Sequence, residues 1–207
     1  PMIRNGWGNF YIPGSSIKGA IRTAIAHYLL KHHENYQVTQ SPSDIEERLR
    51  EKLDNGELKR NQKRADDKLF MNDLFSNFDL YYQNRVGHSK YPKVSPNTDF
   101  MRAIKVSDSN PLVEKKIKLK NGKIGKRNIP IVTEVIVSSH FEDYNAKYRS
   151  SICAEMVYNI STNFTLTIDT KMLSWFCHNK NMKIPFGTID ELLNICREFS
   201  QEQWQFE

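Results

Sequence analysis

Apolar residues recur at three- and four-residue intervals between positions 17 and 29, and this period predicts a helix with one buried face. Pro13-Gly14 ends the apolar run before this helix, and either of the two serines that follow can cap its first turn. Lys18 and Arg22 lie one turn apart on another face, so their charges can act together. The predicted buried face consists of Ile17, Ala20, Ile21, Ala24, Ile25, Tyr28 and Leu29.

Residues 34–98 are predicted to form an insertion of helices and loops. Ser43 and Glu46 fit a capping box, which would begin a charged helix with Ile45, Leu49 and Leu53 on one side. An aromatic-rich segment follows, and its nearly helical spacing favours packing in a core over stacking on nucleobases. The members of this segment are Leu69, Phe70, Leu74, Phe75, Phe78, Tyr81 and Tyr82.

A strand is predicted over residues 99–109, ending in a Ser-Asp-Ser turn that Asp108 would cap. Further along, Asn121-Gly122 is a strong hairpin signal between two strands, which we place near 113–119 and 129–137. We therefore expect residues 112–137 to form a β-hairpin arm.

Apolar and polar residues alternate from Met156 to Asp169, which predicts a half-buried strand that is broken near Thr162. Thr188 and Glu191 form another capping box and begin a last helix. Its predicted inward positions are Ile189, Leu192, Leu193, Cys196 and Phe199. This order of elements predicts an α+β fold: a ferredoxin-like (RRM-like) sheet with helical insertions, in a single domain over residues 1–207.

Composition narrows the class of protein. The chain has 207 residues, of which 39% are hydrophobic, enough for a packed core. Its three cysteines form no Cys-x-x-Cys pair, which fits a reduced cytoplasmic protein and argues against a zinc knuckle. No apolar run is long enough to span a bilayer, so we expect no membrane partner, and no pattern of residues indicates a cofactor or a metal.

Charge is concentrated in one segment of the chain. The net charge is +6, but seven basic residues and no acidic residue lie between positions 115 and 127. Such a run indicates a polyanionic partner, either RNA or an acidic protein surface. These residues, all predicted to contact RNA, are Lys115, Lys116, Lys118, Lys120, Lys123, Lys126 and Arg127.

The turn into the first helix is a second candidate site. A helix start offers N–H groups to an anion, and hydroxyls, cations and a bare glycine nearby suit a phosphate. The predicted phosphate ligands are Gly14, Ser15, Ser16, Lys18, Gly19 and Arg22. The spacing is not that of a nucleotide-binding P-loop. A purely structural strand-to-helix turn would also use these residue types.

The string from Tyr11 to Arg22, Tyr-Ile-Pro-Gly-Ser-Ser-Ile-Lys-Gly-Ala-Ile-Arg, resembles the hallmark of the RAMP superfamily, the repeat-associated proteins of CRISPR effector complexes. Residues 100–111 and 154–169 resemble, within that superfamily, the fifth Csm subunit of type III-A complexes. A first strand and a glycine-rich loop of that pattern are missing. We therefore expect this chain to be a fragment that lacks N- and C-terminal parts.

The resemblance implies an RNA-binding subunit of a Csm complex in antiviral defence. It would cap the 3′ end of the guide RNA (crRNA) and support its trimming by cellular nucleases. Its neighbours would be the Csm backbone and small subunits, with target RNA nearby. Phosphate contacts hold a backbone without reading sequence, which suits a subunit that accepts any guide. Trp7 and Tyr11 are candidates for base stacking, although Tyr11 also fits a core position.

Two other functions stay open. A RAMP endoribonuclease that processes or cleaves RNA would need a general acid or base such as His27 or His88, and Asp99 or Asp108 could hold a metal. We find no motif for either site and expect no intrinsic catalysis. Alternatively, the chain is a scaffold whose basic hairpin binds an acidic protein.

Overall fold

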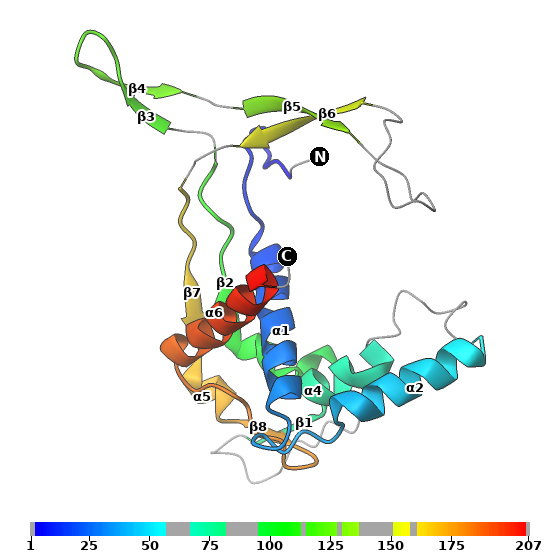
Figure 1. Cartoon of the computed structure of the whole chain (residues 1–207). Helices are drawn as coiled ribbons and strands as arrows, with labels where there is room; N and C mark the ends of the chain where they lie inside the picture. The colour runs from blue at the N-terminus through cyan, green and yellow to red at the C-terminus, as the bar shows by residue number, and fades with distance from the viewer. Residues whose placement is uncertain are drawn as a thin grey trace. The chain divides into compact units, whose positions relative to one another are not determined.

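The structure, a computed structural model, describes residues 3–56, 67–81, 95–112, 115–127, 130–136, 151–157 and 161–205 (Figure 1). The chain divides into two compact units. The first unit comprises Pro1–Ile17 and Ser107–Thr165, and the second comprises Lys18–Val106 and Leu166–Glu207. The prediction of a single domain with an insertion at 34–98 stays a prediction. None of the described helices is long and apolar enough to cross a membrane.

Strands in the described residues pair two by two, always antiparallel. The four pairs are β1 (Phe78–Leu80) with β8 (Phe176–His178), β2 (Ile104–Val106) with β7 (Leu166–Ile168), β3 (Lys115–Lys118) with β4 (Ile124–Arg127), and β5 (Pro130–Ile136) with β6 (Ser151–Val157). Helices and small antiparallel sheets together make a mixed fold, as the α+β prediction requires. The ferredoxin-like arrangement stays a prediction.

Helix α1 (Gly14–Lys31) covers the predicted positions 17–29 but begins earlier, so the prediction that Ser15 or Ser16 caps it is wrong, because both serines lie inside its first turn. Ile21, Ala24, Ile25 and Leu29 are buried as predicted. Ala20 was assigned to the wrong face, because it is exposed, and Ala26 is buried in its place.

An aromatic cluster forms the centre of the second unit, and Phe100 lies in the middle of it. The Phe100 ring stacks on Phe75 with ring centroids 5.2 Å apart and meets Phe78 edge-on at 5.3 Å. Phe186 from the loop before the last helix lies 6.1 Å away. Phe75 and Phe100 are fully buried, so these rings hold distant segments of the chain together.

Only the second half of the predicted insertion reaches this core. Helix α2 (Pro42–Asp54) has no buried residue, and Leu53 is 57% exposed. Its N-cap is Ser41, not the predicted Ser43, because Ser41 and Asp44 bond reciprocally and Pro42 occupies the first helical turn. The next elements, η2 (Asp67–Met71), α4 (Asn72–Ser76) and β1, reach the core. They bury Leu69, Leu74, Phe75, Phe78 and Leu80, whereas Phe70 is half-buried and Tyr81, also predicted to pack in a core, is 41% exposed.

The strand predicted over residues 99–109 is wrong in its first half. Short helices η3 (Pro96–Thr98) and η4 (Phe100–Ala103) precede the strand, which begins only at Ile104. The carboxylate of Asp99 caps η4 by accepting the N–H of Met101 at 2.8 Å. The helical turn buries Phe100, Met101 and Ala103, which an alternating strand could not all turn inward.

The hairpin at Asn121-Gly122 is present, but its second strand differs from the prediction. The turn closes between Leu119 and Lys123, with Gly122 at a φ of +76°, so the partner of β3 is the adjacent β4. Strand β5, which was expected to be that partner, pairs with β6 instead. A tight turn at an Asn-Gly pair selects the strand directly after it.

The last part of the chain, from β7 to α6, largely matches the predicted pattern. The predicted break after β6 is present, since β7 begins only at Leu166, and Asp169 then caps α5 (Thr170–Leu173). Glu191 and Thr188 form the expected capping box of α6 (Ile189–Gln205). Leu192 is buried as predicted, but Ile189 is 40% exposed because it lies in the first turn, and Ile195 is buried in its place.

His178, at the end of β8, is a buried structural histidine. Its Nδ1 accepts the backbone N–H groups of Lys180 and Met182, at 3.1 and 3.3 Å, and its Nε2 lies 2.9 Å from the Asp73 carbonyl oxygen. This set of partners requires a neutral ring with its proton on Nε2. Burial lowers the pKa of His178, although the nearby Asp73 opposes this effect.

We predict that acid destabilises the second unit through His178. The unfolded chain takes up a proton at this ring near its ordinary pKa of 6.5, whereas the folded chain resists protonation. The stabilisation is therefore complete above that pH and is lost as pH falls below it. The urea midpoint should fall more between pH 7.5 and 5.5 in the natural protein than in His178→Gln. Equal falls in the two proteins would contradict this role.

Candidate nucleic-acid interface

The start of α1 is capped from another part of the first unit. The backbone N–H of Gly14 donates to Oδ1 of Asp108 at 2.7 Å. Beside it, the N–H of Ile12 donates to the Ser109 hydroxyl at 2.9 Å. The prediction that Asp108 caps its own turn is therefore wrong, since its carboxylate bonds to the positive end of the helix dipole. The Ser-Asp-Ser phrase anchors the Pro-Gly-Ser-Ser turn.

This cap changes what the helix start can offer to a phosphate. A carboxylate already lies on the Gly14 amide, and the N–H groups of Ser16 and Ile17 donate to the Pro13 carbonyl at 3.0 and 3.2 Å. The residues Ser15, Ser16 and Gly19 are exposed, and the space beside Gly19 is open. Phosphate binding here stays a prediction, and it depends on these hydroxyls more than on the backbone amides.

Lys18, the first predicted phosphate cation, has a partner within the second unit. Its Nζ donates to the backbone carbonyl of Ile104 at 2.8 Å. Burial lowers the pKa of Lys18, while the nearby Asp99 partly offsets that effect. The ammonium therefore fastens α1 to β2, and a phosphate would have to compete with this contact.

Arg22, the second predicted phosphate cation, is held on two sides. Its Nη1 donates to Oδ2 of Asp99 at 2.6 Å, and its guanidinium lies 3.9 Å from the centre of the Phe75 ring. Both side chains of the pair are largely buried, with 26% of Arg22 and 16% of Asp99 exposed. Contact of Arg22 with RNA stays a prediction, but its partners give it a structural role.

His27, one of the two histidines considered for catalysis, lies in the C-terminal half of α1 and contacts α6. His27 and Lys31 pair with Glu202, while Lys31 and His32 pair with Glu198. Hydrogen bonds to the two glutamates raise the pKa of Lys31, and its ammonium lowers the pKa of Glu198. These contacts join two helices. His88 lies outside the described residues.

Asp99 and Asp108, considered as metal ligands, both bond to protein groups, as described above. Within the part of the chain that the structure describes, no group of three or more His, Cys, Asp or Glu side chains could hold a metal ion.

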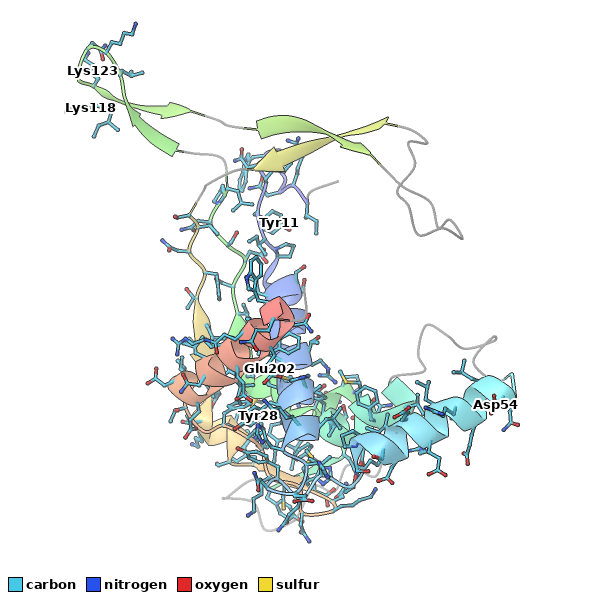
Figure 2. All side chains as sticks on the ribbon, in the orientation of Figure 1. Tyr11, Tyr28, Asp54, Lys118, Lys123 and Glu202 are labelled. Carbon is cyan, nitrogen blue, oxygen red and sulfur yellow. The ribbon has the colours of Figure 1, made fainter. Side chains whose placement is uncertain are left out.

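The basic hairpin, residues 115–127, presents its charge at the turn. Lys118, Lys120 and Lys123 are exposed there, and Figure 2 shows the side chains of Lys118 and Lys123 on this hairpin. The register places a basic residue opposite a basic residue twice, Lys115 opposite Arg127 and Lys116 opposite Lys126. The side chains of these four residues lie outside the described set. Like charges at opposed positions weaken a hairpin, so a bound polyanion would stabilise this one.

Net positive charge is greater in the unit that contains this hairpin. The first unit has ten Lys and Arg against six Asp and Glu, a net charge of +4. The second unit is larger, yet its twenty basic residues face eighteen acidic ones, a net charge of +2. The excess of positive charge, which favours an anionic partner, is therefore larger in the first unit.

Comparison with known families agrees with the Pro-Gly-Ser-Ser string and the mixed fold. The pattern of the RAMP superfamily matches residues 1–198. The chain belongs to the RAMP superfamily. No curated protein matches it.

This RAMP chain is also similar to a solved structure, the crystal structure of Csm5 from T. onnurineus, with a TM-score of 0.58 and 21% sequence identity. The similarity covers 99% of this chain and 53% of that chain, so the RAMP chain spans about half of that protein's length. At this level of identity, the similarity shows a shared fold.

Sequence reasoning missed the partners of the two aspartates. Asp99 directly precedes Phe100 and Met101, and an aspartate before buried apolar residues is a usual N-cap. That signal could have placed η4. Nothing in the local sequence indicates that Asp108 reaches Gly14, because the two residues lie 94 positions apart.

We predict that Asp108→Ala lowers the free energy of unfolding by about 1 kcal/mol, because it leaves the first amide of α1 without its acceptor. Asp108→Asn should lower the free energy of unfolding by only about 0.3 kcal/mol, because the amide oxygen of asparagine still accepts the hydrogen bond. Chemical denaturation measures both values. A loss as large for Asn as for Ala would show that the charge, not the hydrogen bond, stabilises the helix start.

Proposed function

We propose that this RAMP protein is a guide-binding subunit of a type III-A Csm complex in CRISPR antiviral defence. It holds the 3′ end of the guide RNA in the cytoplasm, beside the Csm backbone and small subunits and near the target RNA. Cellular nucleases trim the guide end that it leaves accessible. Membership of the superfamily and the fold shared with T. onnurineus Csm5 support this proposal.

The observation that carries the proposal is the basic hairpin. Three exposed lysines surround its turn, and residues 115–127 contain no acid that could neutralise them. Lysine ammonium groups bind phosphates as point charges and read no base. A subunit that accepts every guide sequence needs this kind of contact. The exposed hydroxyls of Ser15 and Ser16 add neutral donors for the same backbone.

We propose binding without cleavage. An endoribonuclease that uses histidine as its general acid or base needs an imidazole that is placed to take up and return a proton. In this chain His27 lies 3.5 Å from the carboxylate of Glu202 and packs against Phe199, and His178 is neutral and buried. Each of these rings already has a structural role.

Replacing Lys118, Lys120 and Lys123 together with glutamine tests the proposal. Each phosphate contact that is lost reduces the number of counterions released when RNA binds. The slope of log affinity against log salt should therefore become shallower by about 2 for single-stranded RNA. The matched control replaces three exposed lysines of the second unit, Lys105, Lys171 and Lys183, with glutamine. It removes the same charge and should leave the slope near that of the natural protein.

Equal slopes for the hairpin variant and the natural protein would contradict the hairpin as an RNA contact. If the natural protein binds no RNA but binds an acidic polypeptide through the same lysines, the scaffold function is correct instead. If the purified natural protein cleaves guide RNA and the His27→Ala variant does not, the endoribonuclease function is favoured.

A further inference from the structure

Residues 5–9 form a rigid turn near the start of the first unit, here called the Trp7 turn. The side-chain oxygen of Asn5 accepts the backbone N–H groups of Trp7 at 3.0 Å and Asn9 at 2.9 Å. The backbone N–H of Asn5 donates to the Asn9 carbonyl, and that of Gly8 donates to the Asn5 carbonyl, both at 2.9 Å. Together with the bridge between Arg4 and Phe10, these bonds fix the conformation. A side chain on this turn is presented at little entropic cost.

The turn presents an indole to solvent. Trp7 is 88% exposed, the largest exposure among the exposed large apolar side chains of the described residues. Glycines flank it on both sides, and no heavy atom beyond the residues adjacent in the chain lies within 4 Å of where a Cβ would stand on Gly6 or Gly8. Gly8 has a φ of +80°, which favours glycine. A flat ligand can therefore approach the turn without meeting a neighbouring side chain at these two positions.

The segment that contains Trp7 is basic in its own sequence, which favours an anionic ligand. The sequence contains no acidic residue before Glu34, and Arg4 lies in the same segment, its guanidinium 3.9 Å from the centre of the Phe10 ring. Trp204 is nearly as exposed, at 81%, but it follows Glu198 and Glu202 on α6. The two tryptophans thus provide a natural comparison, one in a basic segment and one beside acids.

We propose that Trp7 is a stacking platform for a nucleobase of bound single-stranded RNA. The inference rests on the proposed function, in which the lysines of the basic hairpin hold phosphates. A nucleobase offers a flat π-face to the indole, and stacking tolerates every base, as a guide-binding subunit requires. Aromatic rings with nearby cations are the usual means of holding single strands without reading sequence.

Two probes with the same number of phosphates separate stacking from charge: an oligouridylate and its abasic counterpart. Trp7→Leu should weaken binding of the oligouridylate about tenfold, because one stacked base is lost. Its binding of the abasic probe and its salt slope should equal those of the natural protein. Trp7→Phe should recover part of the loss, and Trp204→Leu, the matched control, should change neither affinity.

Each other outcome overturns the inference. If Trp7→Leu binds the oligouridylate as tightly as the natural protein does, the platform is wrong while the proposed function stands. If Trp7→Leu binds both probes more weakly, Trp7 has a structural role and does not stack on a base. If it binds RNA normally but no longer assembles with a protein neighbour, Trp7 belongs to a protein interface. If the natural protein binds neither probe, the proposed function fails, and the platform fails with it.

Discussion

The second unit depends on the ion pair between Arg22 and Asp99. Its two members have further contacts on opposite sides: the guanidinium lies on the Phe75 ring, and the second oxygen of Asp99 caps the short helix that contains Phe100. Phe75 and Phe100 stack on each other in the core. One pair of charges therefore connects α1, α4 and η4 at the point where their aromatic rings meet. Removing either partner would leave a largely buried charge unpaired, which is costly.

This arrangement separates the residues that fold the chain from those available to bind. In α1, Lys18 and Arg22 bond to the segment that begins at Asp99, and the backbone amide of Gly14 bonds to Asp108. Exposed positive charge is most concentrated instead on the basic hairpin, whose described lysines are all exposed. A protein that binds RNA through its backbone needs such charge on its surface, because a charge used in the core contributes little to binding.

Local patterns predicted the elements of this chain well where the signal lies within a few residues of the chain. The period of α1, the hairpin turn at Asn121-Gly122 and the capping box of α6 are all present. Contacts between distant residues explain the differences. Phe100 turns inward on a helical turn because the rings of Phe75 and Phe78 lie there, and Asp108 reaches Gly14 across 94 positions. For the same reason the sequence showed two cations on one helix face but not the carboxylate that pairs with one of them.

Coupling free energies from double-mutant cycles test this account most directly. Two ion pairs of the chain have the same N–O distance of 2.6 Å, the largely buried Arg22–Asp99 and the exposed Arg50–Glu46. We expect a coupling of about 2 kcal/mol for the first pair and below about 0.5 kcal/mol for the second, each measured by urea unfolding of the two single variants and the double variant. A coupling near zero for Arg22–Asp99, or one no larger than that of the exposed pair, would contradict the structural role of this ion pair.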